Sequence, residues 1–153
     1  MIKAIALAGV LGAALLIPAA AQAKDEAPKK GGGTAVFIPA SDLKWADVPD
    51  SPGAKIAPAQ GDPGKGASHF FIKLPAGFSV PQHHHSPDHY VMVMAGTIVF
   101  NVAGQDHTLP PGSYFSFTGK MKHTTRCAEG AECVLFADSR GKWDVVVENA
   151  PKK

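Results

Sequence analysis

From residue 67 onward, hydrophobic and polar residues alternate in short runs that are rich in β-branched and aromatic side chains. Alternation with a period of two is the pattern of a strand that buries one face. Segments containing Gly or Pro separate the runs, and no long apolar repeat of helical period follows the N-terminal region. The runs predicted as strands are residues 68–74, 78–85, 89–95, 97–102, 107–109, 113–117, 122–127, 133–137 and 143–147.

Three weaker segments precede these runs. We expect a strand over residues 34–39, a turn or single helical turn over 41–45, and one more strand within 54–60. Many short strands with Gly/Pro turns between them are typical of a β-sandwich or a small barrel. The pattern therefore predicts an all-β domain with very little helix.

The run from Tyr90 to Met94 is apolar on both faces. Such a run favours a central strand, with one face toward the interior and the other covered by protein. If His89 faces inward, Val91 and Val93 share the inner face, and Met92 and Met94 lie on the other. We interpret the two methionines as packing residues and not as metal ligands.

The N-terminus has the features of a secretory signal. Lys3 supplies a positive charge, residues 4–20 are apolar, and Ala21-Gln22-Ala23 is a small-residue cleavage site. A membrane anchor is the alternative, but the apolar run is short for a span. We therefore expect a signal peptide over 1–23 with cleavage after Ala23, a flexible leader over 24–33 and one domain over 34–150. The expected location is periplasmic or secreted, with no stable membrane insertion once the signal is removed.

Composition narrows the choice of partners. The signal contains one charged residue, Lys3, so the mature chain carries 14 basic and 13 acidic residues that are mostly scattered. This balance does not favour a nucleic-acid partner or an anionic membrane surface. Cys127 and Cys133 are the two cysteines, and in an oxidising compartment they form either a disulfide or two half-buried thiols.

Four of the seven histidines lie within residues 83–89. On a strand, His83 and His85 face the same way and His84 faces the opposite way. The turn Ser86-Pro87-Asp88 then brings His89 to the start of the next apolar run. Neutral imidazoles that converge from adjacent strands are good ligands for transition metals. The alternative is a hydrogen-bonded or solvent-exposed histidine cluster without a metal.

The spacing of Gly77, His83, His85, His89 and Gly96 resembles the first motif of the cupin superfamily. That motif has a Gly, a His-x-His pair, a Glu and a second Gly at these intervals. His89 occupies the place of the usual Glu. This departure removes one negative charge from the expected ligand set.

The segment from Gly112 to His123 resembles the second cupin motif, whose ligand is its His. Here Thr118 replaces the usual Pro, Lys120 the usual Gly and Cys127 the usual Asn, so we expect an altered turn before His123. The surrounding sequence is similar to uncharacterised bacterial cupins akin to the cupin half of zinc-binding anti-sigma factors. The segments 61–66 and 74–78 and the cysteine pair carry this closer resemblance.

The resemblance implies the cupin double-stranded β-helix, a jelly-roll-like β-sandwich barrel. It also implies that one divalent metal ion, Fe, Mn, Zn or Ni, is bound by His83, His85, His89 and His123. Four neutral imidazoles would leave the charge of the metal uncompensated, which favours a small-molecule ligand that is anionic. A homodimer is compatible with this interpretation.

Two functions follow from this interpretation. The first is a metal-dependent oxygenase-type enzyme that acts on a small molecule, because a six-coordinate metal would keep open positions. The second is a non-catalytic cupin that binds or senses a small ligand or a metal and has a structural Zn site. The sequence does not identify a catalytic acid or base. We expect His69 and His107 to be ordinary strand histidines, and Trp45 and Trp143 to cap the ends of the barrel.

Overall fold

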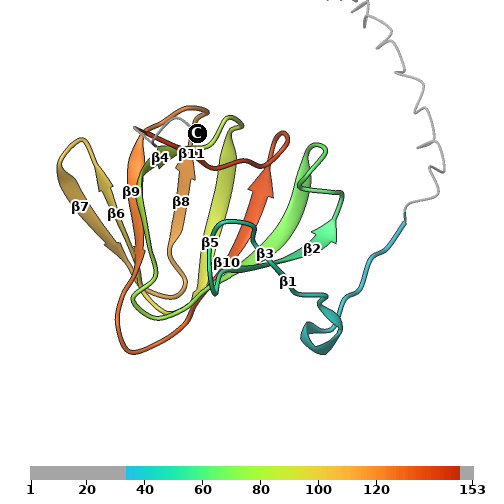
Figure 1. Cartoon of the computed structure of the whole chain (residues 1–153). Coiled ribbons are helices and arrows are strands. Elements are labelled where there is room, and N and C mark those ends of the chain that lie inside the picture. Colours follow the sequence, from blue (N-terminus) through green and yellow to red (C-terminus); the bar gives the residue numbers. More distant parts are fainter. Residues whose placement is uncertain (1–33, 149–153) are drawn as a thin grey trace, which may run out of the picture. The chain divides into compact units, whose positions relative to one another are not determined.

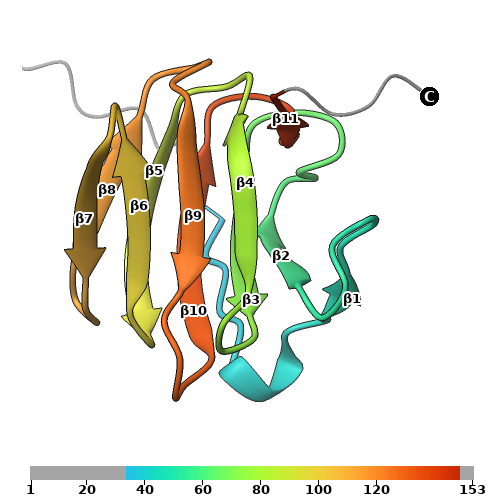
Figure 2. The ribbon, with the colours of Figure 1, turned by 60° about the vertical axis from the view of Figure 1, so that its left-hand side comes forward.

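The computed structural model describes residues 34–148, and these residues form two facing antiparallel sheets (Figure 1). One sheet has six strands in the order β1-β2-β3-β10-β5-β8, and the other has five in the order β11-β4-β9-β6-β7. The five-stranded sheet lies in front in Figure 2. The strands are β1 (Ala46–Asp47), β2 (Lys55–Gln60), β3 (Ser68–Leu74), β4 (Ser79–His84), β5 (His89–Ala95), β6 (Ile98–Val102), β7 (Gln105–Leu109), β8 (Tyr114–Phe117), β9 (His123–Cys127), β10 (Cys133–Ser139) and β11 (Val146–Val147).

The prediction of an all-β, jelly-roll-like β-sandwich is confirmed. β3 and β5 have the predicted bounds, because each is a run of β-favouring residues that ends at a clear turn signal. A single 3₁₀ turn, Ala40–Asp42, occupies the segment where a turn was expected.

Two strand predictions are wrong. Residues 34–39 form no strand, and Phe37 is 89% exposed, because none of the described strands pairs with this segment. The predicted strand over 143–147 is reduced to β11. Its first residues turn inward instead, where Trp143 packs against His85.

The core lies between the two sheets and is formed by buried apolar side chains, most of them from β3, β5, β6 and β10. Phe70, Val93, Ile98 and Leu135 belong to it, together with both cysteines. Cys127 and Cys133 form a disulfide that joins the end of β9 to the start of β10. The structure therefore selects the disulfide over two separate thiols.

The prediction for the run from Tyr90 to Met94 is half confirmed. Val91 and Val93 are buried on the inner face of β5, as expected. Tyr90, Met92 and Met94 are 37%, 46% and 52% exposed, so the outer face is not covered within a single chain. The reason is architectural, since each sheet of a two-layer sandwich has an outer face that nothing in the same chain needs to cover.

The predicted signal peptide (1–23) and leader (24–33) lie outside the described residues, as do the last two residues of the predicted domain 34–150. Between residues 34 and 148, the structure contains no helix long and apolar enough to cross a membrane.

Candidate metal centre

The four predicted ligands come together at one end of the sandwich. His83 in β4 and His123 in β9 are direct partners across two neighbouring strands of the five-stranded sheet. His85 follows β4 by one residue, and His89 begins β5 in the six-stranded sheet. The site therefore spans both sheets.

Three of the four histidines form the tightest group. The ligand atoms that His83, His85 and His123 can offer all lie within 4.8 Å of one another, which is a spacing that could hold a metal ion. His89 is not in this group, although its ring centroid lies 4.8 Å from that of His85. The residues present fit a metal held by three imidazoles, with a fourth imidazole at its border.

All four rings are oriented by backbone carbonyl groups. The Nδ1 atom of His83 donates to the carbonyl of Pro81 at 2.8 Å, and that of His123 donates to Met121 at 2.9 Å. His89 bonds in the same way to Pro87, and His85 to Asp144. A carbonyl only accepts, so each Nδ1 carries the proton and Nε2 is left as the acceptor. Bonds of this kind fix the tautomer and the direction of metal-binding histidines.

Burial keeps these histidines uncharged. All four are buried. Loss of hydration lowers the pKa of His85 to about 2 and the pKa of His123 to about 4. The same effect holds the pKa of His83 and of His89 below the ordinary value. The cluster is thus neutral near pH 7, which is the state that metal binding requires.

Aromatic rings pack directly on the histidines. Trp143 stacks on His85 with 4.0 Å between centroids, and Phe117 stacks on His123 with 4.3 Å. Trp143 was expected to cap an end of the barrel, and the structure places its ring against the histidine cluster at one end of the sandwich, where it also lines the cavity. No local pattern around Trp143 signals this contact, since it depends on how the segment after β10 returns across the sheet. Trp45, by contrast, packs under the ammonium group of Lys73.

His84 faces away from the other histidines, as the alternation predicts. Its Nδ1 donates to Glu148 at 2.7 Å, and Lys122 lies 2.8 Å from the other oxygen of that carboxylate. The pKa of Glu148 is held below its usual value, mainly by the hydrogen bond from Lys122 and to a smaller extent by the one from His84. His69 and His107 lie in β3 and β7, outside the cluster.

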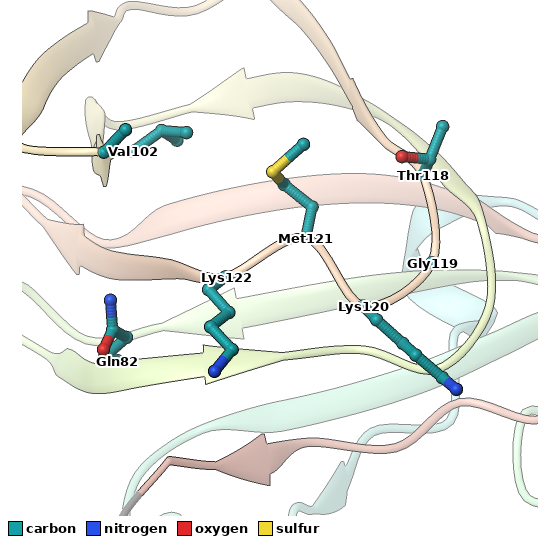
Figure 3. Close-up of a pocket in the computed structure, with 8 residues that line it drawn as sticks. Gln82, Val102, Thr118, Gly119, Lys120, Met121 and Lys122 are labelled. Atoms are coloured by element: carbon teal, nitrogen blue, oxygen red, sulfur yellow. The ribbon is translucent and has the colours of Figure 1, made fainter.

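The turn before His123 keeps a demanding backbone conformation despite its altered sequence. Lys120 has φ +67°, a left-handed conformation that favours glycine, and its N–H donates to the carbonyl of His85 at 2.8 Å. In Figure 3 the side chains of Lys120 and Lys122 point away from Met121. A hollow of about 490 Å³ lies beside this turn, but none of the four clustered histidines lines it.

A larger cavity of about 690 Å³ opens onto the histidine cluster. All four histidines line it, and so does Trp143. The rest of the wall is mostly apolar and comes from strands of both sheets and from the connection before β2. The aromatic residues Phe78, Phe100 and Phe115 belong to it. A metal held at the cluster would therefore face a space of the size that small-molecule sites have.

Solved structures with the same fold are cupins. The polyketide cyclase RemF from Streptomyces resistomycificus is 14% identical with a TM-score of 0.65, and the match covers 78% of this chain and 89% of that chain. An RmlC-like cupin from Ralstonia eutropha JMP134 is 25% identical with a TM-score of 0.59, covering 71% and 69%. The fold of the described residues is therefore the cupin fold. The chain belongs to the DUF4437 family, a domain of unknown function, which matches residues 12–146.

Two further comparisons limit what can be transferred. No curated protein matches the sequence. A chain in the structure of Rhodobacter sphaeroides SigE in complex with the anti-sigma ChrR is 20% identical with a TM-score of 0.52, covering 66% of this chain and 51% of that chain. At this identity the likeness concerns the fold alone, so the closer resemblance to anti-sigma factors stays a prediction.

Proposed function

We propose that this chain is an exported cupin that binds one divalent metal ion and acts on a small molecule as an oxygenase-type enzyme. His83, His85 and His123 are the proposed ligands, with His89 as the fourth. The observation that carries the proposal is that these buried, neutral imidazoles line a cavity of about 690 Å³. A metal bound there would have room for a ligand beside it.

The donor set supports more than one metal. Imidazole suits Fe, Ni, Cu and Zn, and six-coordinate Fe²⁺, Mn²⁺ or Ni²⁺ would keep two positions beyond four histidines. When bound, a redox-active ion of this kind supplies electron transfer to dioxygen, and Zn²⁺ supplies Lewis acidity alone. The chain itself orients the donor rings through four carbonyl groups and excludes water with Trp143 and Phe117.

A small-molecule substrate is also consistent with the solved relatives. RemF is described as a polyketide cyclase, and another cupin neighbour from Ruegeria pomeroyi is described as a DMSP lyase. Neither reaction transfers to this chain at 14% and 18% identity. We propose that the small molecule binds the metal through an anionic donor atom. Neutral imidazoles would leave the positive charge of the metal ion uncompensated, and that charge would be confined to the metal.

Export belongs to the same proposal. The sequence over residues 1–23 has a charged start, an apolar stretch and a cleavage site. The disulfide between Cys127 and Cys133 fits an oxidising compartment. The proposed location is the periplasm or the medium, and mass spectrometry of the secreted chain should find Lys24 as the first residue. A homodimer stays a prediction.

A non-catalytic binding cupin with a structural Zn site is the second candidate. One observation favours it. Among the described residues that line the cavity, the ionisable groups besides the histidines are Asp50 and Asp144. The Asp144 carboxylate already accepts from the N–H and the hydroxyl of Ser86, at 2.7 and 2.6 Å. The described cavity wall therefore offers no evident general base, as expected for a binding protein without catalytic activity.

Azide binding to the cobalt-loaded protein separates the two candidates. An open position predicts a change in the visible absorption of Co²⁺ when azide is added, because azide would enter the coordination sphere. In the variant His89→Glu, which restores the usual cupin ligand, the metal should be retained and azide should bind more weakly. A wild-type spectrum that azide does not change would favour the closed, structural site.

A further inference from the structure

We infer that the ligand of this cavity is a largely apolar molecule with one oxygen donor at the histidine end and no second anionic group. The inference rests on the proposed function for the role of the donor. It goes further by naming the class of molecule that the rest of the wall accepts. Three features carry it: the uneven distribution of polar residues along the cavity, the charges of its wall and its volume.

Strand register places the polar residues at one end. His89 in β5 lies opposite Ser139 in β10, and Ser139 lies opposite Ser68 in β3. In the other sheet His83 lies opposite His123. All of these side chains are buried. The three histidines line the cavity, whereas Ser68 and Ser139 lie at the same end of the sandwich without lining it.

The wall becomes apolar further along the same strands. Leu135, four residues before Ser139 in β10, pairs with Ile72 on one side and with Val93 on the other. Leu135 and Ile72 both line the cavity, as do Leu74 and Phe78. On the facing sheet, the inward residue after His123 in β9 is Thr125, which lies opposite Phe100 and Val80. Ser51, Ser79 and Thr125 add hydroxyl groups to the wall, but most of the lining residues besides the histidines are apolar. A molecule that fills this space therefore buries mostly apolar surface, which is favourable in proportion to the area removed from water.

The charges of the wall argue against a second anionic group on the ligand. Of the residues between 34 and 148 that line the cavity, none is Lys or Arg. A carboxylate or sulfonate at the far end of the ligand would therefore be buried without a cation, and burial of an unpaired charge is costly. Apart from the histidines, the ionisable residues of the described wall are Asp50 and Asp144, and both carboxylates would repel such a group.

The volume sets the size of the ligand. About 690 Å³ lies within the range of pockets that hold a small organic molecule. A fused pair of aromatic rings with one hydroxyl group would fit with room to spare.

A matched pair of probes tests this inference. 2-Naphthol and 6-hydroxynaphthalene-2-sulfonate carry the same hydroxyl group, and the second adds a sulfonate at the opposite end. Calorimetric titration of both into the zinc-loaded chain should show 2-naphthol binding at one site and the sulfonate binding at least about tenfold more weakly, since 1.4 kcal/mol corresponds to tenfold. Equal or tighter binding of the sulfonate, or binding of neither probe to metal-loaded protein, would overturn the inference.

Two variants test whether the probes bind in this cavity and whether its apolar wall determines the preference between them. Ile72→Lys places a cation in the apolar part of the cavity, and should weaken 2-naphthol and strengthen the sulfonate. Met92→Lys, on the exposed face of β5, is the control and should change neither affinity. If Ile72→Lys fails to fold, Ile56→Lys serves the same purpose, because Ile56 also lines the cavity. An unchanged preference in a folded cavity variant would count against the assigned wall.

The same titrations separate this inference from the proposed function. Metal content is measured by mass spectrometry on each sample. Discrimination between the probes by a chain that takes up no metal would overturn the metal proposal and leave the apolar ligand class standing. Stoichiometric metal with no preference for 2-naphthol would do the reverse.

Discussion

His84 and His85 are adjacent in the sequence but have opposite roles at the level of single residues. His85 is buried in the cluster, and His84 donates to Glu148 on the other side of β4. We predict that His85→Ala weakens zinc binding by at least about a hundredfold, because it removes a ligand directly, whereas loss of a residue that only supports a ligand typically costs ten- to a hundredfold. His84→Ala is the matched control and should leave zinc affinity nearly unchanged. Competition with a chromophoric chelator measures both, and equal losses would contradict the alternation of faces.

Protonation of the buried histidines should destabilise the metal-free chain in acid. Burial lowers the pKa of His123 to about 4, whereas in the unfolded chain it is about 6.5. The unfolded state therefore binds more protons between these values, so stability is greatest above pH 6.5 and falls as the pH drops toward 4. Protonation of His123 alone should lower the free energy of unfolding by about 3 kcal/mol between pH 7 and pH 4.

Urea unfolding of the metal-free protein at several pH values measures this loss. His123→Gln should flatten the pH dependence relative to the wild type. A free energy of unfolding that is constant from pH 7 to pH 4 would mean that the cluster is hydrated and not buried. In the metal-loaded protein the decline should be steeper, because protons also compete with the metal.

Lys120 is a residue under backbone strain. It adopts φ +67° at a position where the cupin motif usually has Gly. We predict that Lys120→Gly stabilises the chain by about 1 kcal/mol, because the left-handed conformation costs other residues roughly that amount. Thermal unfolding of this variant and of Lys122→Gly, in the same turn at a residue without positive φ, provides the comparison. Destabilisation by Lys120→Gly would show that its side chain contributes more than its backbone costs.

At the level of elements, the disulfide closes the connection between β9 and β10. It joins residues six apart, at the end of the sandwich opposite the histidines. The chain-entropy relation for so short a loop gives about 2 kcal/mol of stabilisation. We predict that Cys127→Ala with Cys133→Ala lowers the melting temperature and leaves metal affinity unchanged. A parallel loss of metal would mean that the two ends of the sandwich are coupled.

The elements that the sequence predicted best are those with a local signal. β5 could be predicted because a β-favouring apolar run lies between two turn signals. Its inner face followed from placing His89 inward, since Val91 and Val93 lie on the same face of the strand as His89. The strand predicted over 34–39 was wrong because an apolar run does not show whether a partner strand is present. The segment after β10 was also misjudged, since the contact of Trp143 with His85 joins residues 58 apart in the sequence. Such long-range contacts leave no periodic pattern.

At the level of the whole molecule, the fold brings together histidines from three strands and one turn. The structure brings His83, His85 and His123 together, and strand alternation accounts for the shared face of His83 and His85. Their role as metal ligands stays a prediction. The border position of His89 could not be predicted, since it depends on how the two sheets are spaced. The cavity was equally inaccessible to sequence reasoning, because packing between the sheets determines its volume.

Metal content is the most direct test of this account. The full chain, produced without an affinity tag and equilibrated with Zn²⁺ or Fe²⁺ after removal of bound metal, should retain one metal ion per chain after gel filtration. The double variant His83→Ala with His123→Ala should retain none, while circular dichroism confirms that its sheets are intact. A folded wild-type chain that retains no metal, or a double variant that retains as much as the wild type, would contradict the central claim that this histidine cluster is a metal site.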